Sequence, residues 1–501
     1  MKWVHRLTKL HEFINLGDKS ITMKKTLLLV MFLTIVLSGK AQDKKTDYTE
    51  ALKLIEVWLD AQRDYDKVPG MSVIIVDDQE VMWSGAFGMA NLEDQVKTTP
   101  STLYSICSIS KLFTSVAIMK LYDEAKLRLD DEISDLLPWY DLKQKYEDSW
   151  PITIRTLLTH SSGLPRESNH PYWTGPDHPF PVSEAVKSEL HKQETLYPSS
   201  TYFQYSNLGL TLLGEVIEEV SGMPYEAYIK ENILNPLELK NTRTFLPEDQ
   251  YGTTLATGYA TLNRDGEREK VKLFQGNGIK AAAGFSSNVN DLGKFASWQF
   301  RLFDTTSTEI LKPSTLKYMQ NVHWTDPDWK ATWGLGFWVV KGENGEKRVG
   351  HSGHCPGYAT YFSMFPAKKR AYAVFTNGNN TKRAGYIQGM HNILEKYKKT
   401  EDKNAVKEEV PGLDEYEGYY SRLPWSSEIY VGSWHNKLVM LNLPTSDPAE
   451  SLIELKYTRK DTFRRLRDDG ELGEAFEFER DESGSIYRIK RHNNYFSRIR
   501  N

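Results

Sequence analysis

The chain has 501 residues, of which 40% are hydrophobic and 26% are charged, and its formal net charge is −4. This length predicts two or three domains of about 100–200 residues each. The composition is that of globular proteins with full hydrophobic cores, which argues against wholesale disorder. No block of lysine and arginine marks a basic surface, so we exclude nucleic acid as a partner.

The N-terminal region has the pattern of a secretory signal peptide over residues 23–41. Two lysines precede an apolar run at 27–37, and small residues follow it up to Ala41, where we expect cleavage. The run is shorter than the roughly 20 residues of a membrane span, so we expect no span after cleavage. Residues 1–22 show no periodic pattern, and we interpret them as an over-extension of the reading frame. We therefore expect export, to the periplasm; the alternative is an uncleaved signal anchor.

The next part of the chain, 45–396, contains strands at both ends and helices in the middle. An amphipathic helix is expected over 48–63, followed by a hairpin of strands 71–76 and 81–87. The other expected elements are helices at 108–125, 152–159 and 207–220, strands at 333–340, 358–365 and 371–376, and a helix at 383–398. This order predicts an α/β (α+β) fold in which an antiparallel sheet flanked by helices carries an inserted helical subdomain.

The last part of the chain has a different character. Residues 397–412 are dense in charge and poor in large apolar residues, which indicates a linker. Residues 413–501 contain short alternating runs separated by turn residues. This pattern predicts a small all-β domain, either a sandwich or a barrel.

The segment "SICSISK", residues 105–111, contains a serine and a lysine three positions apart, Ser108 and Lys111. Residues with this spacing share one face of a helix. A serine hydroxyl is a poor nucleophile until a base takes its proton, and the lysine is placed to be that base. A free lysine titrates near pH ~10.4, so we expect burial or a cationic neighbour to lower its pKa.

Two later segments carry partners for this pair. In "FQYSNLG", the hydroxyl of Tyr205 is suited to relay a proton to or from the serine, and the amide of Asn207 to hold a substrate carbonyl. The segment "GHSGHCPGY", residues 350–358, contains His351, a donor to the substrate or the tyrosine, and Gly353, which lets a strand edge approach a ligand.

The third segment also supplies half of an expected oxyanion hole. The backbone N–H groups of His354 and Ser108 are expected to bind the oxygen on which negative charge develops. The two cysteines of the chain, Cys107 and Cys355, directly flank these two donors. We favour two buried free thiols; the alternative is a disulfide that fixes the hole, which requires Cα atoms within about 7 Å.

In order and spacing, these motifs resemble those of the penicillin-recognising serine hydrolase superfamily, in the branch around class C β-lactamases, D-alanyl-D-alanine carboxypeptidases, D-aminopeptidases and related esterases. The S-x-x-K motif of that family matches Ser108–Lys111, its Y-x-N motif matches Tyr205–Asn207, and its third motif matches His351–Gly353. Strings such as "VPGMSVIIV" and "LLTHSSGLP" extend the resemblance over about 48–395. Residues 413–501 resemble the small lipocalin-like β domain that follows some D-aminopeptidase relatives.

The resemblance implies an active site in the groove between sheet and helical subdomain, and an acyl-enzyme formed on Ser108. Lys111 and Tyr205 then share the proton transfers, and which of them is the acylation base stays open. No metal or cofactor is implied, and the histidines and aspartate of 169–182 have no ligand pattern. The aromatic residues of that segment are expected to form a local core over the helical subdomain rather than a substrate pocket.

We therefore predict an exported serine hydrolase acting on an amide or ester of a peptide-like or acyl substrate. His351 stands where many β-lactamases carry lysine, and a histidine is mostly neutral above about pH 6.5. This argues against efficient hydrolysis of penicillins. The alternative is a penicillin-binding or sensor protein that acylates slowly, or that binds cell-wall peptides without efficient turnover.

Overall fold

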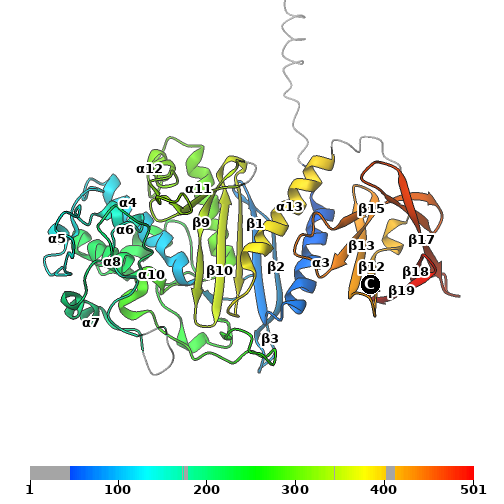
Figure 1. Cartoon of the computed structure of the whole chain (residues 1–501), viewed down its shortest axis with the longest axis horizontal. Helices are drawn as coiled ribbons and strands as arrows, with labels where there is room; N and C mark the ends of the chain where they lie inside the picture. Colours follow the sequence, from blue (N-terminus) through cyan, green and yellow to red (C-terminus); the bar gives the residue numbers. More distant parts are fainter. Residues whose placement is uncertain (1–45, 172, 174–178, 343–344, 402–411, 501) are drawn as a thin grey trace, which may run out of the picture. The chain divides into compact units, whose positions relative to one another are not determined.

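The central sheet has nine strands and draws them from two distant segments of the chain (Figure 1). Its order is β3-β2-β1-β11-β10-β9-β8-β7-β6, and the paired strands are antiparallel. The strands are β1 Gly70–Asp77, β2 Glu80–Asn91, β3 Val96–Lys97, β6 Trp324–Thr325, β7 Thr332–Trp333, β8 Trp338–Lys341, β9 Lys347–Cys355, β10 Tyr358–Phe365 and β11 Arg370–Thr376. The prediction of an antiparallel sheet made from both ends of this region is confirmed.

The computed structural model describes residues 46–171, 173, 179–342, 345–401 and 412–500. The expected signal peptide at 23–41, the segment 1–22 and most of the expected linker at 397–412 lie outside the described residues. From Thr49 onward the chain forms one compact unit. Within the described ranges, no helix is both long enough and apolar enough to cross a membrane.

Strand β1 lies at the centre of the packing, with β2 on one side and β11 on the other. All of its residues except Asp77 are buried, because helices cover both faces of the sheet. Helices α3, Thr49–Tyr65, and α13, Arg383–Glu401, lie on one face, and α11, Val289–Phe303, lies on the other (Figure 1). A strand covered on both faces reads as a continuous apolar run, which explains the string "MSVIIV".

The helical subdomain is inserted between β3 and β6. Its helices are α4 Ser110–Asp123, α5 Ile133–Leu136, α6 Ile154–Leu158, α7 Ser183–Ser188, α8 Asn207–Ser221, α9 Tyr225–Ile229, α10 Lys280–Ala283 and α12 Pro313–Met319. Helix α8 begins where Ser206 Oγ accepts the N–H of Gly209, and it ends at Gly222, whose φ of 69° is left-handed. Phe180 packs on Phe274 and Ile279, so the aromatic segment expected to form a local core does so where it is described.

The helix expected at 108–125 begins differently. A 3-10 turn, η3 Cys107–Ile109, comes first, and α4 follows it from Ser110. The side chain of Ser110 binds the carbonyl oxygen of Cys107 at 2.6 Å and accepts the N–H of Phe285 at 3.1 Å. These bonds draw the chain into a tight turn, so the nucleophile candidate lies in the turn and not in the α-helix.

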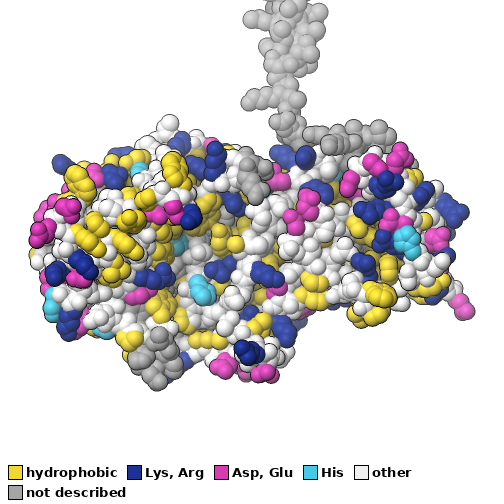
Figure 2. Space-filling view, in the orientation of Figure 1, with side chains coloured by type: hydrophobic (Ala, Val, Ile, Leu, Met, Phe, Trp, Pro, Cys, Tyr) yellow, Lys and Arg dark blue, Asp and Glu magenta, His cyan; other side chains and the backbone are white. Residues whose placement is uncertain are grey.

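The C-terminal residues form a closed eight-stranded barrel, which decides between the two expected all-β forms. Its strands are β12 Gly418–Ser421, β13 Glu428–Trp434, β14 Lys437–Leu443, β15 Leu452–Arg459, β16 Thr462–Leu466, β17 Leu472–Arg480, β18 Ile486–Arg491 and β19 Asn494–Arg500. Buried aromatic and aliphatic side chains, among them Tyr420, Phe463 and Phe476, fill the interior. A barrel of this size is filled by side chains, so the interior is a core. On the face shown in Figure 2, basic and acidic side chains are interspersed over this region.

Candidate active site

The structure brings Ser108 and Lys111 together as their spacing predicts. Lys111 Nζ lies 3.1 Å from Ser108 Oγ, and the lysine is only 1% exposed. The same nitrogen also donates to Asn207 Oδ1 at 2.7 Å and to the carbonyl oxygen of Ala282 at 2.8 Å. Both of these atoms are acceptors only, so each requires an N–H from the lysine.

This geometry gives a neutral Lys111 a defined orientation. A neutral amine has two N–H bonds, and the two acceptors use both of them. Its lone pair is then left for the third direction, toward Ser108 Oγ. Burial lowers the pKa of Lys111 well below its usual value; the nearby Glu167 raises the pKa, and Arg166 lowers it. Burial is the largest of these effects, so the site favours the neutral base.

Tyr205 lies directly before the N-terminal turn of α8 and faces the same two groups. Its ring centroid is 5.0 Å from Lys111 Nζ, and its hydroxyl is hydrogen-bonded to Ser108. Burial raises the pKa of Tyr205 well above its usual value, so the phenol is protonated in the resting site at neutral pH. The ring of His160 packs on Tyr205 at 4.3 Å, and its Nδ1 accepts the N–H of Ser206 at 3.1 Å, which holds this segment in place.

His351 on β9 is neutral and its tautomer is fixed. Its Nδ1 lies 2.7 Å from the carbonyl oxygen of Ser352, and since a carbonyl only accepts, Nδ1 carries the proton. Nε2 is therefore an acceptor, so the neutral ring does not fit the expected role of His351 as a donor to the substrate or the tyrosine. Burial, with the nearby Lys111, lowers the pKa of His351 to about 3. The site thus contains no permanent cation at this position.

Gly353 lies where β9 presses against the turn before the nucleophile. A Cβ at this position would come within 2.3 Å of the carbonyl oxygen of Ile106 and 2.2 Å of Thr360 Oγ1, so only glycine fits. Thr360 in turn donates to the same carbonyl oxygen at 3.1 Å. This close approach brings the strand segment of His354 beside η3, as the proposed pair of oxyanion donors requires.

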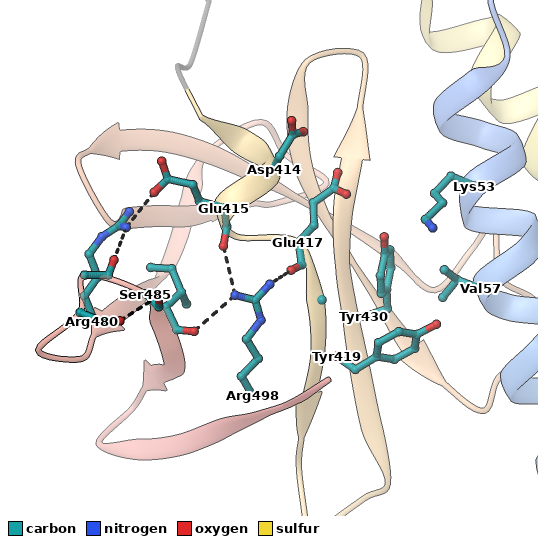
Figure 3. A pocket seen from close by; sticks show the side chains of 14 residues that line it. Lys53, Val57, Asp414, Glu415, Glu417, Tyr419, Tyr430, Arg480, Ser485 and Arg498 are labelled. Carbon is teal, nitrogen blue, oxygen red and sulfur yellow. Dashed lines mark hydrogen bonds and ion pairs between the residues drawn. The ribbon is translucent and has the colours of Figure 1, made fainter. Parts of the chain in front are cut away.

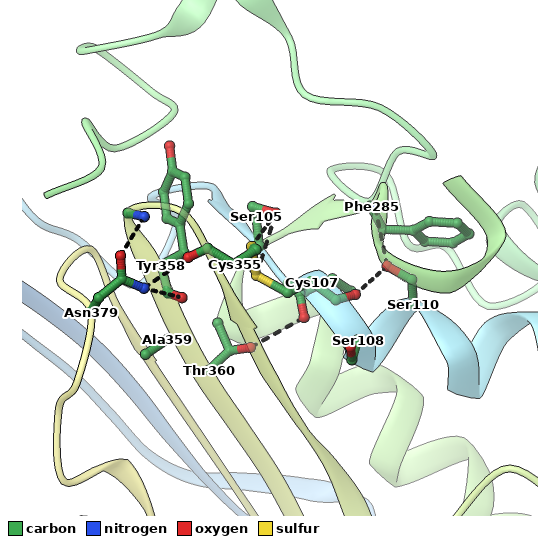
Figure 4. The surroundings of a disulfide bond; sticks show 12 residues. Ser105, Cys107, Ser108, Ser110, Phe285, Cys355, Tyr358, Ala359, Thr360 and Asn379 are labelled. Carbon is green, nitrogen blue, oxygen red and sulfur yellow. Dashed lines mark hydrogen bonds between the residues drawn. A yellow bond between two sulfur atoms is a disulfide. The ribbon is translucent and has the colours of Figure 1, made fainter. Parts of the chain in front are cut away.

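A disulfide links the residues beside the two proposed oxyanion donors (Figure 4). Cys107 and Cys355 have Cα atoms 5.8 Å apart, so the favoured interpretation as two free thiols is wrong. The bond joins η3 to the end of β9 over a sequence separation of 248 residues. Cys107 has a left-handed φ of 49°, a strained conformation that surrounding structure must hold.

A cavity of about 460 Å³ opens on these residues. Its lining residues are Ser108, Arg166, Phe203, Tyr205, Trp333, Trp338, Val340, His351, Ser352, His354 and Tyr361. Four aromatic side chains besides Tyr205 give this wall apolar surface, which lies beside polar groups such as Ser108 and Arg166. Burial, with Arg383, lowers the pKa of His354, so this histidine is neutral at neutral pH as well.

Larger cavities lie elsewhere. One of about 830 Å³ is lined by barrel residues together with Lys53 and Val57 of α3 (Figure 3). Its arginines are bonded within the barrel: Arg480 pairs with Glu415 at 2.7 Å, and Arg498 donates to backbone carbonyls. Two serines line this cavity: Ser483 Oγ donates to the Asp481 carboxylate and to Ser485, and among the described residues neither serine is bonded to a lysine or histidine, so the smaller cavity is the catalytic candidate.

Two residues that the motif analysis missed border the site. Glu167 Oε1 accepts from Asn207 Nδ2 at 2.7 Å, and Arg166 Nε lies 3.1 Å from the same oxygen. The guanidinium of Arg166 also lies over the ring of Tyr205, 4.9 Å from its centroid. Their position directly after the string "LLTHSSGLP", which carries part of the family resemblance, was the one feature of the sequence that pointed to these two residues.

Comparisons with known proteins agree with this arrangement. The model of the Beta-lactamase family matches residues 58–391. The chain is 27% identical over 332 residues to the unguisins hydrolase of Aspergillus campestris, covering 64% of this chain and 60% of that protein. It is 26% identical over 358 residues to a putative D-alanyl-D-alanine carboxypeptidase of Escherichia coli, covering 64% of this chain and 81% of that protein.

Solved structures share the fold. The octameric penicillin-binding protein homologue from Pyrococcus abyssi superposes with a TM-score of 0.61 at 26% identity, covering 90% of this chain and 99% of that one. A D-stereospecific amidohydrolase from Streptomyces gives a TM-score of 0.55 at 22% identity, covering 68% of this chain and 98% of that one. At this lower identity the similarity is one of fold.

The disulfide gives a first prediction. The double variant Cys107→Ser/Cys355→Ser should have a kcat/KM for an ester that is lower by about tenfold or more. Each donor of an oxyanion hole contributes a factor of about 10²–10³ to kcat, and loss of the cross-link should misplace the donors and remove part of that factor. Its free energy of unfolding should fall by about 2–5 kcal/mol. Steady-state kinetics and denaturant unfolding measure both effects. Ser105→Ala is the control, because Ser105 Oγ contacts both sulfurs without being part of the cross-link. A double variant with wild-type kinetics and stability would contradict this role.

Proposed function

Because the chain belongs to the beta-lactamase family, we propose that it is a serine hydrolase that cleaves esters or amides through an acyl-enzyme on Ser108. The observation that carries this proposal is the environment of Lys111 Nζ. Its two N–H bonds are directed to Asn207 Oδ1 and the Ala282 carbonyl, which leaves its lone pair for the proton of Ser108. A serine with a base so oriented is an activated nucleophile.

In the acylation step, Ser108 Oγ attacks the substrate carbonyl carbon and its proton passes to Lys111. The negative charge on the carbonyl oxygen is bound by the N–H groups of Ser108 and His354. The leaving group takes a proton through Tyr205, which is protonated at rest and hydrogen-bonded to Ser108. Water then attacks the acyl-enzyme, its proton enters the same lysine–tyrosine pair, and Ser108 is regenerated. The raised pKa of Tyr205 favours Lys111 as the acylation base.

The charges of the cavity support a neutral substrate with an apolar group. His351 and His354 are neutral, and Arg166 is paired with Glu167, so no unpaired cation is present among the described residues that line the cavity. The only counter-ion that the described lining offers a substrate carboxylate is Arg166, whose charge is already offset by Glu167, so such a carboxylate would recover little of its lost hydration. Phe203, Trp333 and Trp338 instead offer apolar surface. The relatives include a hydrolase of unguisins and a putative D-alanyl-D-alanine carboxypeptidase, in line with a hydrolase of peptide-like substrates.

We also propose export. The signal-like pattern at 23–41 supports it, and so does the disulfide, since disulfides persist in oxidising compartments. The turn that contains Ser108 would then be cross-linked to β9 only after the chain has left the cytoplasm.

Replacement of the nucleophile tests the proposed function. Ser108→Ala should lower the turnover of p-nitrophenyl butyrate by about a thousandfold or more, because the partners of a catalytic unit do not compensate for the lost nucleophile. Spectrophotometric release of p-nitrophenol measures this. The control is Ser188→Ala, whose hydroxyl donates to the Ala185 carbonyl on α7. Near-wild-type turnover by Ser108→Ala would refute the assignment. A stoichiometric burst without turnover in the wild type would favour the penicillin-binding or sensor function.

Matched substrates test the proposed preference for neutral groups. A phenyl ester should be cleaved with at least about tenfold higher kcat/KM than its 3-carboxyphenyl counterpart, since burying an unpaired carboxylate costs well over 1.4 kcal/mol. Trp338→Ala should lower kcat/KM for the neutral ester, whereas Trp329→Ala, at an 81% exposed position, should not. Equal or faster cleavage of the carboxylated ester would show that the cavity contains an anion-binding group.

A further inference from the structure

Asn207 is held between Lys111 and a carboxylate that the motifs do not include. Its Oδ1 accepts from Lys111 Nζ at 2.7 Å, and its Nδ2 donates to Glu167 Oε1 at 2.7 Å. Asn207 is 2% exposed, and the side chain of Glu167 is 20% exposed. A chain of hydrogen bonds therefore runs from Glu167 through Asn207 and Lys111 to Ser108.

The backbone around Glu167 is fixed on both sides. The N–H of Asn207 donates to the carbonyl oxygen of Arg166 at 2.7 Å, and Ser206 Oγ donates to that of Pro165 at 2.7 Å. Gln193 Nε2 donates to the carbonyl oxygen of Glu167 itself at 3.0 Å. The segment is thus attached to the N-terminus of α8, which places the carboxylate at the side chain of Asn207.

The orientation of the Asn207 amide decides what Lys111 can do. With Oδ1 toward the lysine, the amide takes one N–H and the lone pair remains for Ser108. With the amide turned by 180°, its NH₂ group would face Nζ and donate to that lone pair, so the base would be blocked. A carboxylate only accepts, and therefore Glu167 binds the NH₂ end and excludes the turned orientation.

We propose that Glu167 is a positioning residue of the reaction: by binding Asn207 Nδ2 it holds Oδ1 on Lys111 and thereby keeps the lone pair of the lysine directed at Ser108. This inference rests on the proposed serine hydrolase function. Glu167 does not touch the reacting atoms; it acts through Asn207.

Arg166 complements this role through its charge. A lone carboxylate near Lys111 would favour the ammonium form and so weaken the base. The guanidinium of Arg166, 3.1 Å from the carboxylate, offsets that charge. Accordingly Glu167 raises the pKa of Lys111 and Arg166 lowers it. The other titratable groups that face Lys111 are Tyr205, His160 and His351, and burial lowers the pKa of both histidines, so that they are neutral at neutral pH.

Glu167 and Arg166 shift the pKa of Lys111 in opposite directions, and this difference distinguishes a role in catalysis from a purely structural role. Activity should rise with pH as Lys111 loses its proton. The acid limb of the plot of kcat/KM against pH therefore follows the pKa of this lysine. Glu167→Gln removes the charge that raises this pKa and should move the limb to lower pH. Arg166→Gln should move it to higher pH. Glu189→Gln, which removes a carboxylate that contacts Lys192 and Asn169, is the control and should leave the limb in place.

The alanine variant tests the orientation itself. Glu167→Ala should lower kcat by about tenfold to a hundredfold and change KM by less than about threefold. A positioned base typically accelerates a reaction by about 10²–10⁴-fold, and the loss of its orientation should remove part of this acceleration. Glu167→Gln should restore most of kcat, because its amide oxygen can still accept from Asn207. In a crystal structure of Glu167→Ala, the Asn207 amide should turn or Lys111 Nζ should leave Ser108.

A second measurement separates this inference from the proposed function. Labelling of Ser108 by a fluorophosphonate, in which Oγ bonds to phosphorus and fluoride leaves, requires the activated serine but no particular substrate. Slow labelling of Glu167→Ala beside fast labelling of the wild type supports the role of Glu167. Equal labelling rates, an unmoved acid limb and an unchanged Lys111–Ser108 contact would overturn it. A wild-type protein that is labelled no faster than Ser108→Ala would instead refute the serine hydrolase function.

Discussion

The buried amine of Lys111 is the constraint on which the rest of the site depends. A lysine at 1% exposure is costly as a cation, so burial drives it toward the neutral form. A neutral amine is useful only if its lone pair has a direction, and the acceptors Asn207 Oδ1 and Ala282 O supply that direction. The proposed chemistry of Ser108 follows from these two facts.

Several parts of the fold serve this one geometry. The helical subdomain supplies α4 and the N-terminus of α8, while the sheet supplies β9, which approaches the nucleophile turn so closely that only Gly353 fits. The Cys107–Cys355 bond fixes the same approach covalently. The groups that face the substrate thus come from both the sheet and the helical subdomain, and the described side chains that line the cavity are uncharged except for Arg166.

The sequence predicted what depends on short spacings. Ser108 and Lys111 lie three residues apart, and short, largely apolar runs at 71–76 and 358–365 indicate strands, so these features were found. The bond between Glu167 and Asn207 spans 40 residues and the disulfide spans 248, and no local pattern reports such contacts. The barrel closes because β12 pairs with β19, the first strand with the last. Alternation of polar and apolar residues occurs in the strands of barrels and sandwiches alike, so it could not predict this closure. Helix α4 begins at Ser110, and not at residue 108 as expected, because the side chain of Ser110 closes a 3-10 turn by binding the carbonyl oxygen of Cys107.

The protonation state of Lys111 is the most direct test of this account. Nitrogen-15 NMR of the lysine side chains in the full-length chain, assigned by comparison with Lys111→Arg, reports the pKa of Nζ. Lys111 should titrate well below the ordinary lysine value of about 10.4, and Nζ should be largely neutral at the pH of maximal activity. A Lys111 that stays protonated through that pH would contradict its role as the base that activates Ser108.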